Sequence, residues 1–204
     1  MNSYTQSLTK RLFDLTFALP GLIVLSPLFI LITLLIFMDD KGPVIFAQQR
    51  AGKNGKLFLM YKFRTRIAGA ESFGRQLTVG EDKRITRTGS LLRKTKLDEL
   101  PQLINVVLGN MSLVGPRPEV PKYVALYTPE QREVLKLTPG ITDPASIKYR
   151  NESDILSNSS NPEQTYIEQI MPDKIRHNLE YAAHASLITD FTLILKTIAR
   201  LAFS

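Results

Sequence analysis

The longest apolar stretch of the chain covers residues 15–38 and contains no charged side chain. As a single helix these 24 residues would rise about 36 Å, more than the ~30 Å hydrocarbon layer of a membrane. Ser26 and Pro27 interrupt the stretch. Pro27 has no N–H for the carbonyl of Ile23, and Ser26 can bond back to Leu22, so both favour a bend. We predict a membrane-inserted helix broken at Ser26 and Pro27.

Three placements of this segment are open. A cleaved signal peptide has an apolar run of about 7–15 residues and a small-residue cleavage site, neither of which is clear here. A membrane-spanning anchor stays open because membrane helices tolerate proline. Lys10 and Arg11 precede the segment and a basic region follows it from Lys41, and basic flanks favour the cytoplasmic side. A re-entrant helix satisfies both flanks, so residues 1–40 are assigned to the membrane insert and 41–204 to one cytoplasmic domain.

The next apolar runs, 44–46 and 57–61, flank an Asn54-Gly55 pair. Asn-Gly is a strong hairpin signal because both residues accept positive φ, so we expect a β-hairpin. A polar loop is expected over 69–84 and a short basic helix over 90–96. Pro101 is tolerated best in a first helical turn, which predicts a helix from about Asp98 to Leu108.

The remaining segments predict a mainly helical α+β fold with interfacial helices. Two prolines bracket Arg117 and fix a rigid loop that presents it. Thr128 to Gln131 has the features of a helix start, with a cap, a proline and a capping-box glutamine, and this helix stops before Pro139. Residues 152–161 are interpreted as a surface loop. The final apolar stripe, from Leu187 to Ile198, has helical spacing; core packing is the expectation and membrane binding the alternative.

The net charge is +7, and half of the 26 basic residues lie in two short stretches without an acid, 41–66 and 83–96. Close to a membrane, anionic lipids attract each such charge by about 1 kcal/mol, and phosphate ligands are drawn to the same surface. A merely solvated basic face is the alternative. No zinc-finger, RNP-type or helix-turn-helix pattern indicates a nucleic-acid partner. The sequence has no cysteine, which excludes disulfides and thiolate metal sites.

Asp98 and Glu99 are the candidate reactive groups. Adjacent acids at a helix start are often only dipole complements or caps. The same helix end can hold a phosphate on its free N–H groups, which would put the Asp98 carboxylate beside an electrophilic phosphorus. A divalent cation bridging carboxylate and diphosphate, together with Arg117, would compensate the charges.

Several linked motifs carry a resemblance to a known family. They are Phe46-x-Gln48-x-Arg50-x-Gly52-x-x-Gly55-Lys56, Tyr61-Lys62-Phe63-Arg64-Thr65, Arg84-Ile85-Thr86-Arg87-x-Gly89, Leu97-Asp98-Glu99-Leu100-Pro101-Gln102-Leu103-x-Asn105 and Gly115-Pro116-Arg117-Pro118. Over nearly its whole length the chain resembles the bacterial sugar transferases, the small monotopic phosphoglycosyl transferases.

The resemblance implies transfer of a sugar 1-phosphate from a UDP-sugar to a polyprenyl phosphate, usually undecaprenyl phosphate, with release of UMP. It implies that Asp98 attacks the β-phosphorus and forms a covalent phosphosugar intermediate, with Mg²⁺ at the same carboxylate, and that Glu99 assists. Arg117 is expected to grip phosphate and Arg150 to contact the nucleotide sugar. Lys62 and Arg64 are further substrate-binding candidates, or structural cations under the lipid headgroups.

Such an enzyme belongs on the cytoplasmic face of the bacterial inner membrane, among anionic lipids, and an oligomer is left open. The chain departs from the usual family pattern at Arg66, at Asp143, where a glycine is usual, and at Pro20, a second weak point in the insert. A different class of function, a membrane-anchored adaptor with a basic recruiting face, predicts tolerance of substitutions at Asp98 and Glu99.

Overall fold

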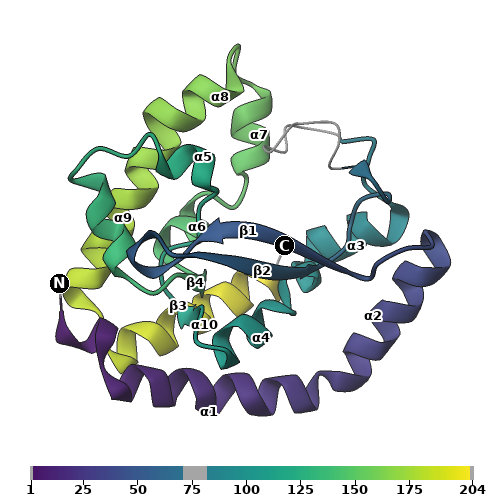
Figure 1. Ribbon diagram of the computed structural model, residues 1–204, viewed down its shortest axis with the longest axis horizontal. Coiled ribbons are helices and arrows are strands. Elements are labelled where there is room, and N and C mark those ends of the chain that lie inside the picture. Colours follow the sequence, from purple (N-terminus) through teal and green to yellow (C-terminus); the bar gives the residue numbers. More distant parts are fainter. Residues whose placement is uncertain (1, 71–81, 203–204) are drawn as a thin grey trace.

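The computed structural model describes residues 2–70 and 82–202, and is mainly helical with two small sheets (Figure 1). The first half comprises a 3₁₀ turn η1 (Ser3–Gln6), α1 (Leu8–Val24), α2 (Ser26–Asp39), β1 (Ile45–Ala51), η2 (Lys53–Gly55), β2 (Leu57–Phe63), α3 (Arg87–Thr95), η4 (Leu97–Glu99) and α4 (Gln102–Val107). The second half comprises β3 (Ser112–Val114), α5 (Pro121–Val124), η5 (Gln131–Lys136), β4 (Gly140–Thr142), α6 (Pro144–Lys148), α7 (Glu152–Ser157), α8 (Pro162–Thr165), a π-helical turn η6 (Tyr166–Ile170), α9 (Met171–His184) and α10 (Leu187–Ala202). The mainly helical α+β prediction is confirmed; most of the polar loop expected over 69–84 lies outside the described residues.

The apolar insert is two helices, α1 and α2, bent by 58° at a short break. Among the described residues no single helix is long and apolar enough to cross a membrane, whereas α1 and α2 taken together are. Helix α1 continues through Pro20, and Pro27 lies in the first turn of α2, where its missing N–H costs no helical bond. Ser26 Oγ donates to the carbonyl of Ile23 at 2.7 Å. The expected bond to Leu22 was wrong by one residue, because a serine hydroxyl can bond the carbonyl three residues back as well as the one four residues back.

The inner side of α1 is fixed to the rest of the chain by polar side chains. Lys10 Nζ donates to Asp190 on α10 at 2.5 Å, Arg11 donates to the carbonyls of Val106 and Val107 at the end of α4, and Asp14 accepts from the backbone of β3. Lys10 and Asp14 are almost fully buried. The basic pair before the insert therefore docks α1 onto the domain, and Lys10 is not available to lipid headgroups.

The predicted hairpin is confirmed as the antiparallel pair β1–β2, with Asn54 and Gly55 both at positive φ in its turn. The expected basic helix is α3, which begins at Arg87 with Thr86 as its cap. The helix expected from Asp98 to Leu108 is instead a 3₁₀ turn, η4, followed by the short helix α4. Pro101 forms the junction because it has no N–H for the carbonyl of Leu97, so the two pieces cannot share one hydrogen-bond ladder.

The second sheet joins two glycine-containing segments distant in sequence. Strands β3 and β4 pair in parallel, with Ser112 opposite Gly140. Gly115, just after β3, and Gly140 approach so closely that a Cβ on either one would overlap the other segment's backbone, at 2.1–2.4 Å from its nearest atom. Only glycine permits this contact. It holds the Arg117 loop against the start of β4.

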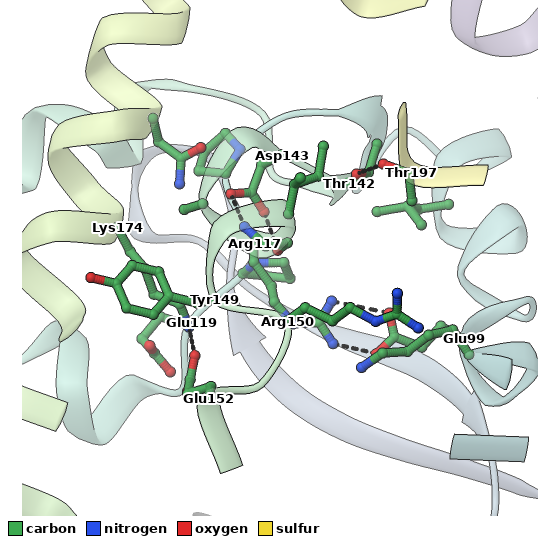
Figure 2. A pocket seen from close by; sticks show the side chains of 18 of the residues that line it. Glu99, Arg117, Glu119, Thr142, Asp143, Tyr149, Arg150, Glu152, Lys174 and Thr197 are labelled. Atoms are coloured by element: carbon green, nitrogen blue, oxygen red, sulfur yellow. Dashed lines mark hydrogen bonds and ion pairs between the residues drawn. The ribbon is translucent and has the colours of Figure 1, made fainter. Parts of the chain in front are cut away.

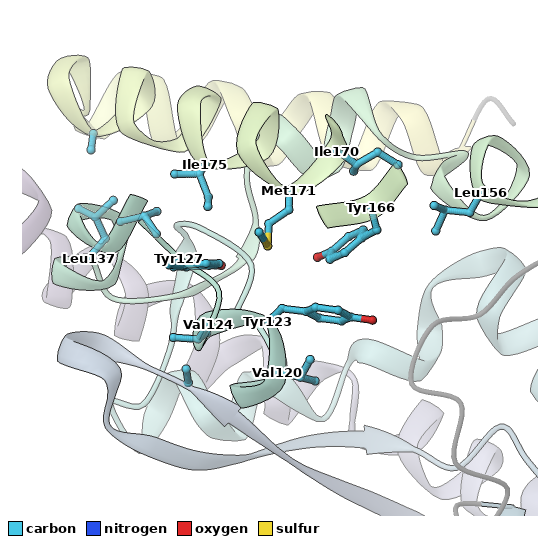
Figure 3. Close-up of a cluster of buried hydrophobic side chains, with 13 residues drawn as sticks. Val120, Tyr123, Val124, Tyr127, Leu137, Leu156, Tyr166, Ile170, Met171 and Ile175 are labelled. Carbon is cyan, nitrogen blue, oxygen red and sulfur yellow. The ribbon is translucent and has the colours of Figure 1, made fainter. Parts of the chain in front are cut away.

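The largest hydrophobic cluster lies under α9 and is built by α5, η5, α7, η6 and α9 (Figure 3). Tyr123, Tyr166 and Met171 are among its most buried members. The surface loop expected over 152–161 was wrong for 152–157, which form α7 with Leu156 buried in this cluster. Residues 158–161 form no helix or strand, as expected. The capping box at Thr128 is present, with Thr128 and Gln131 bonded reciprocally, and it starts the 3₁₀ helix η5.

The apolar stripe of the last helix, α10, faces outward over much of its length. Ile188, Leu195 and Ile198 are 79%, 50% and 57% exposed, while Ile194 packs against the buried cluster that includes Met60 and Val114. The expectation that this stripe packs in the core was therefore wrong for most of its members. Helix α10 is anchored through Asp190, which bonds Lys10, Tyr4 and Tyr181. Phe191, Ile194 and Ile198 of the stripe line a cavity on the domain side of the helix.

Candidate active site

A cavity of about 630 Å³ opens between the hairpin, the Arg117 loop, α6, α9 and α10. Its wall is largely apolar and carries several charged side chains (Figure 2), among them Arg50, Glu99, Arg117, Asp143, Arg150 and Lys174. Charges of both signs in a mostly apolar recess are typical of a small-molecule site. Its lining residues lie between positions 17 and 200, so the sequence alone did not show which residues form this cavity.

Glu99 is the most strongly paired acid of this site. Both of its oxygens accept from the guanidinium of Arg117, the Nη1–Oε2 distance being 3.0 Å, and Lys62 Nζ donates at 3.0 Å. Burial alone would raise the pKa of Glu99, but the charges of Arg117 and Lys62 outweigh it and hold that pKa well below its ordinary value. Glu99 is thus a permanent carboxylate that positions two cations.

Asp98 has a different environment from its neighbour. Its side chain is nearly buried, and its Oδ1 finds no hydrogen-bond partner among the described residues. Burial raises the pKa of Asp98, opposed by the charge of Lys62. The left-handed conformation of Lys96 (φ 59°) ends α3 and starts η4, which directs the two adjacent acids to different surroundings. Asp98 does not line the cavity itself, whereas Lys96, Glu99 and Leu100 do.

The strand β1 fixes the Arg117 loop from the other side. Arg50 Nη1 donates to the carbonyl of Pro118 at 3.1 Å and lies 3.6 Å from Glu119, and Ala51 N donates to Glu119 O. Tyr166 OH also bonds the Glu119 carboxylate. Sequence reasoning assigned no role to Glu119. The signal available was its position directly after the Gly-Pro-Arg-Pro run.

The structure brings four of the six predicted site residues together: Asp98, Glu99, Arg117 and Lys62. Arg150 lines the same cavity, and its guanidinium donates to the carbonyl of Arg200 on α10; its contact with a nucleotide sugar stays a prediction. Arg64 lies elsewhere, since its guanidinium pairs with Asp40 at the end of α2 (Nη1–Oδ2 2.8 Å). This contact ties the hairpin to the insert and matches the structural alternative for Arg64.

Two further residues at the site were missed or left uncertain from sequence. Gln102 is fully buried four positions after Asp98, and neither of its amide atoms has a partner in the described part of the chain. Asp143, the departure from the usual glycine, caps α6 by accepting from Ser146 N at 3.0 Å. It lines the cavity and its charge acts with that of Glu99 in raising the pKa of Arg117.

Comparisons with known proteins identify the family of this chain. A sequence model described as bacterial sugar transferase matches residues 5–204. The chain belongs to the bacterial sugar transferase family. It is 38% identical to an exopolysaccharide production protein, PSS, of Rhizobium leguminosarum bv. phaseoli, over 93% of this chain and 92% of that protein.

Two longer relatives of this sugar transferase have names that state an activity. A UDP-N-acetylgalactosamine-undecaprenyl-phosphate N-acetylgalactosaminephosphotransferase of Aeromonas hydrophila is 35% identical over 93% of this chain and 42% of that protein. An undecaprenyl-phosphate galactose phosphotransferase of Salmonella typhimurium is 38% identical over 71% of this chain and 33% of that protein. Family membership makes the chain a phosphoglycosyl transferase and favours the enzyme over the adaptor.

The residues of this sugar transferase fit a magnesium ion that is held by one carboxylate together with the phosphates of a substrate. Across 2–70 and 82–202 there is no group of three or more acidic, histidine or cysteine side chains that could hold a metal. Mg²⁺ is often held by one or two carboxylates together with substrate phosphates. Asp98 fits this arrangement because its Oδ1 is unpartnered, whereas both oxygens of Glu99 are already engaged.

Proposed function

We propose that the chain transfers a sugar 1-phosphate from a UDP-sugar to a polyprenyl phosphate, with undecaprenyl phosphate as the acceptor. The family match and the names of the relatives from Aeromonas hydrophila and Salmonella typhimurium support this donor and acceptor class. The observation that carries the mechanism is the contrast between the two adjacent acids. Glu99 is saturated by Arg117 and Lys62, while Asp98 keeps an unpartnered oxygen.

In the proposed first step an Asp98 carboxylate oxygen forms a bond to the β-phosphorus of the donor. The bond from that phosphorus to the oxygen bridging the α-phosphate breaks, and UMP leaves. In the second step a phosphate oxygen of the polyprenyl phosphate bonds to the same phosphorus and Asp98 is released. Asp98 would hold Mg²⁺, which supplies charge neutralisation between the carboxylate and the diphosphate when bound.

Arg117 and Lys62 act on the phosphate oxygens in this mechanism. The guanidinium of Arg117 has five donor hydrogens and commits part of them to Glu99, so the remainder are available to an anionic ligand. Glu99 fixes the orientation of both cations in advance, which is the requirement for electrostatic stabilisation of the charge that develops on phosphorus.

The proposed location is the cytoplasmic face of the bacterial inner membrane. The bent α1–α2 pair supports a re-entrant insertion in which both ends return to one face, and the exposed apolar residues of α2 and α10 support contact with lipid. Basic residues of α3 lie on the same domain and suit anionic headgroups. The division into an insert, 1–40, and a cytoplasmic domain, 41–204, belongs to this proposal.

The test is UMP release from a panel of UDP-sugars in the presence of polyprenyl phosphate and magnesium, for the wild-type chain and for Asp98→Asn. We expect UMP from the wild type only, and a trapped sugar-phosphate adduct on Asp98 when the acceptor is omitted. Asp98→Asn should stay membrane-bound, which separates loss of chemistry from loss of insertion. Full activity of Asp98→Asn would reject the nucleophile, and no UMP from the wild type with any donor would reject the function.

A further inference from the structure

One wall of the cavity is a single face of α9. Met171, Lys174, Ile175 and Asn178 all line it, at spacings of three and four residues that place their side chains on one side of a helix. Three of the four side chains find their packing or pairing partners within the chain. Met171 and Ile175 belong to the hydrophobic cluster, and Lys174 is paired with Glu152 (Figure 2).

Asn178 is the exception on this wall. It is only 5% exposed, and its Oδ1 has no hydrogen-bond partner among the residues that the structure describes. Buried side-chain polar atoms are nearly always hydrogen-bonded. Asn178 lines the cavity while this oxygen itself is buried beside it, so a bound ligand supplies the missing partner once the amide turns toward the cavity.

The chemistry of that oxygen restricts the ligand group. A carbonyl oxygen of an amide only accepts, so its partner must be an N–H or O–H. The phosphates of an ionised diphosphate are acceptors and do not qualify. In a nucleotide sugar the donors that remain are the hydroxyls of the sugar and ribose, the N–H groups of an N-acetylated sugar and the N–H of the uracil ring.

The cavity also relates this oxygen to the phosphate-binding residues. Glu99 and Arg117 line the same 630 Å³ space, so one ligand can meet both walls. We propose that Asn178 is a specificity-determining residue of the donor site, whose Oδ1 accepts a hydrogen bond from an N–H or O–H of the nucleotide sugar outside its diphosphate. This inference rests on the proposed function.

The test compares Asn178→Leu, which keeps the volume and removes the acceptor, with Asn178→Ala, which leaves room for water. Glu180→Gln is the matched control, since Glu180 lies on α9 outside the cavity and its side chain is 55% exposed. For each variant, kcat and KM are measured across the UDP-sugar panel, together with inhibition by UMP and the thermal unfolding midpoint.

We expect Asn178→Leu to lower kcat/KM by about 10- to 100-fold for the preferred donor, mainly through KM, because a site built to bond a donor group discriminates strongly when the bond is lost. A parallel weakening of UMP inhibition would assign the bond to uracil or ribose. Unchanged UMP inhibition with an altered ranking of the UDP-sugars would assign it to the sugar. Glu180→Gln should match the wild type in all of these measurements.

Other outcomes would overturn the inference. If Asn178→Leu and Asn178→Ala keep the wild-type KM for every donor and the same UMP inhibition, Asn178 does not read the substrate. If the variants only unfold at lower temperature, with kcat reduced in equal proportion for all donors, the residue is structural. Should Asn178→Leu fail to fold, Asn178→Ala decides by the same criteria. The two failures are distinguishable: the function fails when the wild type releases no UMP, and the inference alone fails when the wild type releases UMP and the Asn178 variants match it for every donor.

Discussion

Asn105 on α4 binds the backbone of β2 at Tyr61: its Oδ1 accepts from Tyr61 N at 3.0 Å, and its Nδ2 donates to the carbonyl of Leu59 at 2.7 Å. The side chain is fully buried. One amide therefore takes the place that a neighbouring strand would occupy on this edge of the hairpin. It fixes β2, and with it Lys62, beside the turn that carries Asp98 and Glu99.

Replacement of Asn105 by leucine should destabilise the fold. It leaves one N–H and one C=O of β2 unpaired in the interior, and each unsatisfied group costs about 1–3 kcal/mol. We expect the free energy of unfolding in detergent to fall by about 2–4 kcal/mol, with a loss of activity as Lys62 shifts. Asn105→Asp, which buries a carboxylate beside the carbonyl of Leu59, should destabilise the fold at least as much as Asn105→Leu. An unchanged unfolding midpoint for Asn105→Leu would show that β2 is held by other contacts.

Arg117→Lys tests the fork between Arg117 and Glu99. Lysine keeps the charge but cannot bond both carboxylate oxygens in one plane, nor hold a phosphate oxygen in the same geometry. We expect kcat/KM to fall by the equivalent of about 1–3 kcal/mol, measured with the preferred donor. Because Arg64 pairs with Asp40 away from the cavity, Arg64→Lys is the matched control and should change stability more than KM. Equal rates for Arg117→Lys and the wild type would reduce Arg117 to a scaffold role.

The pH profile reports on Lys62. Burial, partly offset by the negative charge of Glu99, lowers the pKa of Lys62 to about 8. The positive charges of Arg117 and Arg50 lower this pKa further, and the charge of Asp98 raises it. As the pH rises through 8 the lysine loses its charge and Glu99 loses one of its cations. We expect kcat/KM to fall on the alkaline side with an apparent pKa near 8, and Lys62→Arg to move that limb to higher pH.

The same lysine makes a prediction about stability. Its ordinary pKa is 10.5, so between pH 8 and 10.5 the folded chain binds fewer protons here than the unfolded chain. The contribution of Lys62 to the free energy of unfolding therefore rises with pH across this window. Denaturant titrations at several pH values, on wild type and Lys62→Arg, measure the difference. In the activity profile, a fall of kcat/KM at the same alkaline pH in Lys62→Arg as in the wild type would assign that titration to another group.

The break between α1 and α2 predicts the topology of the insert. The chain has no cysteine, so single probes at Ser3→Cys and Lys41→Cys report the two ends directly. Both should react with a membrane-impermeant reagent from the cytoplasmic side. Ser26→Ala with Pro27→Ala removes the two causes of the bend and should place one probe on the far side. Pro20→Ala should leave the labelling unchanged, since α1 continues through Pro20. Probes on opposite sides in the parent chain would refute the re-entrant placement.

Local sequence determined the elements whose causes are local. The hairpin follows from Asn54 and Gly55, and the position of the break from Ser26 and Pro27. The non-helical loop follows from the prolines around Arg117, because each of these residues restricts its own backbone. The acids at Asp98 and Glu99 were also identifiable, since the motif around them is contiguous.

Tertiary structure decided what depends on contacts between distant segments. Apart from the family resemblance, the sequence does not distinguish Asp98 from Glu99. Only the approach of Lys62 and Arg117 commits Glu99 to two cations and leaves an oxygen of Asp98 without a partner. Leu156 is buried in the helix α7, within a segment expected to be a surface loop, and Asp190 anchors α10 so that part of its apolar stripe lines the cavity. Burial and charge pairing are properties of packed neighbours, so a pattern along one segment cannot fix them.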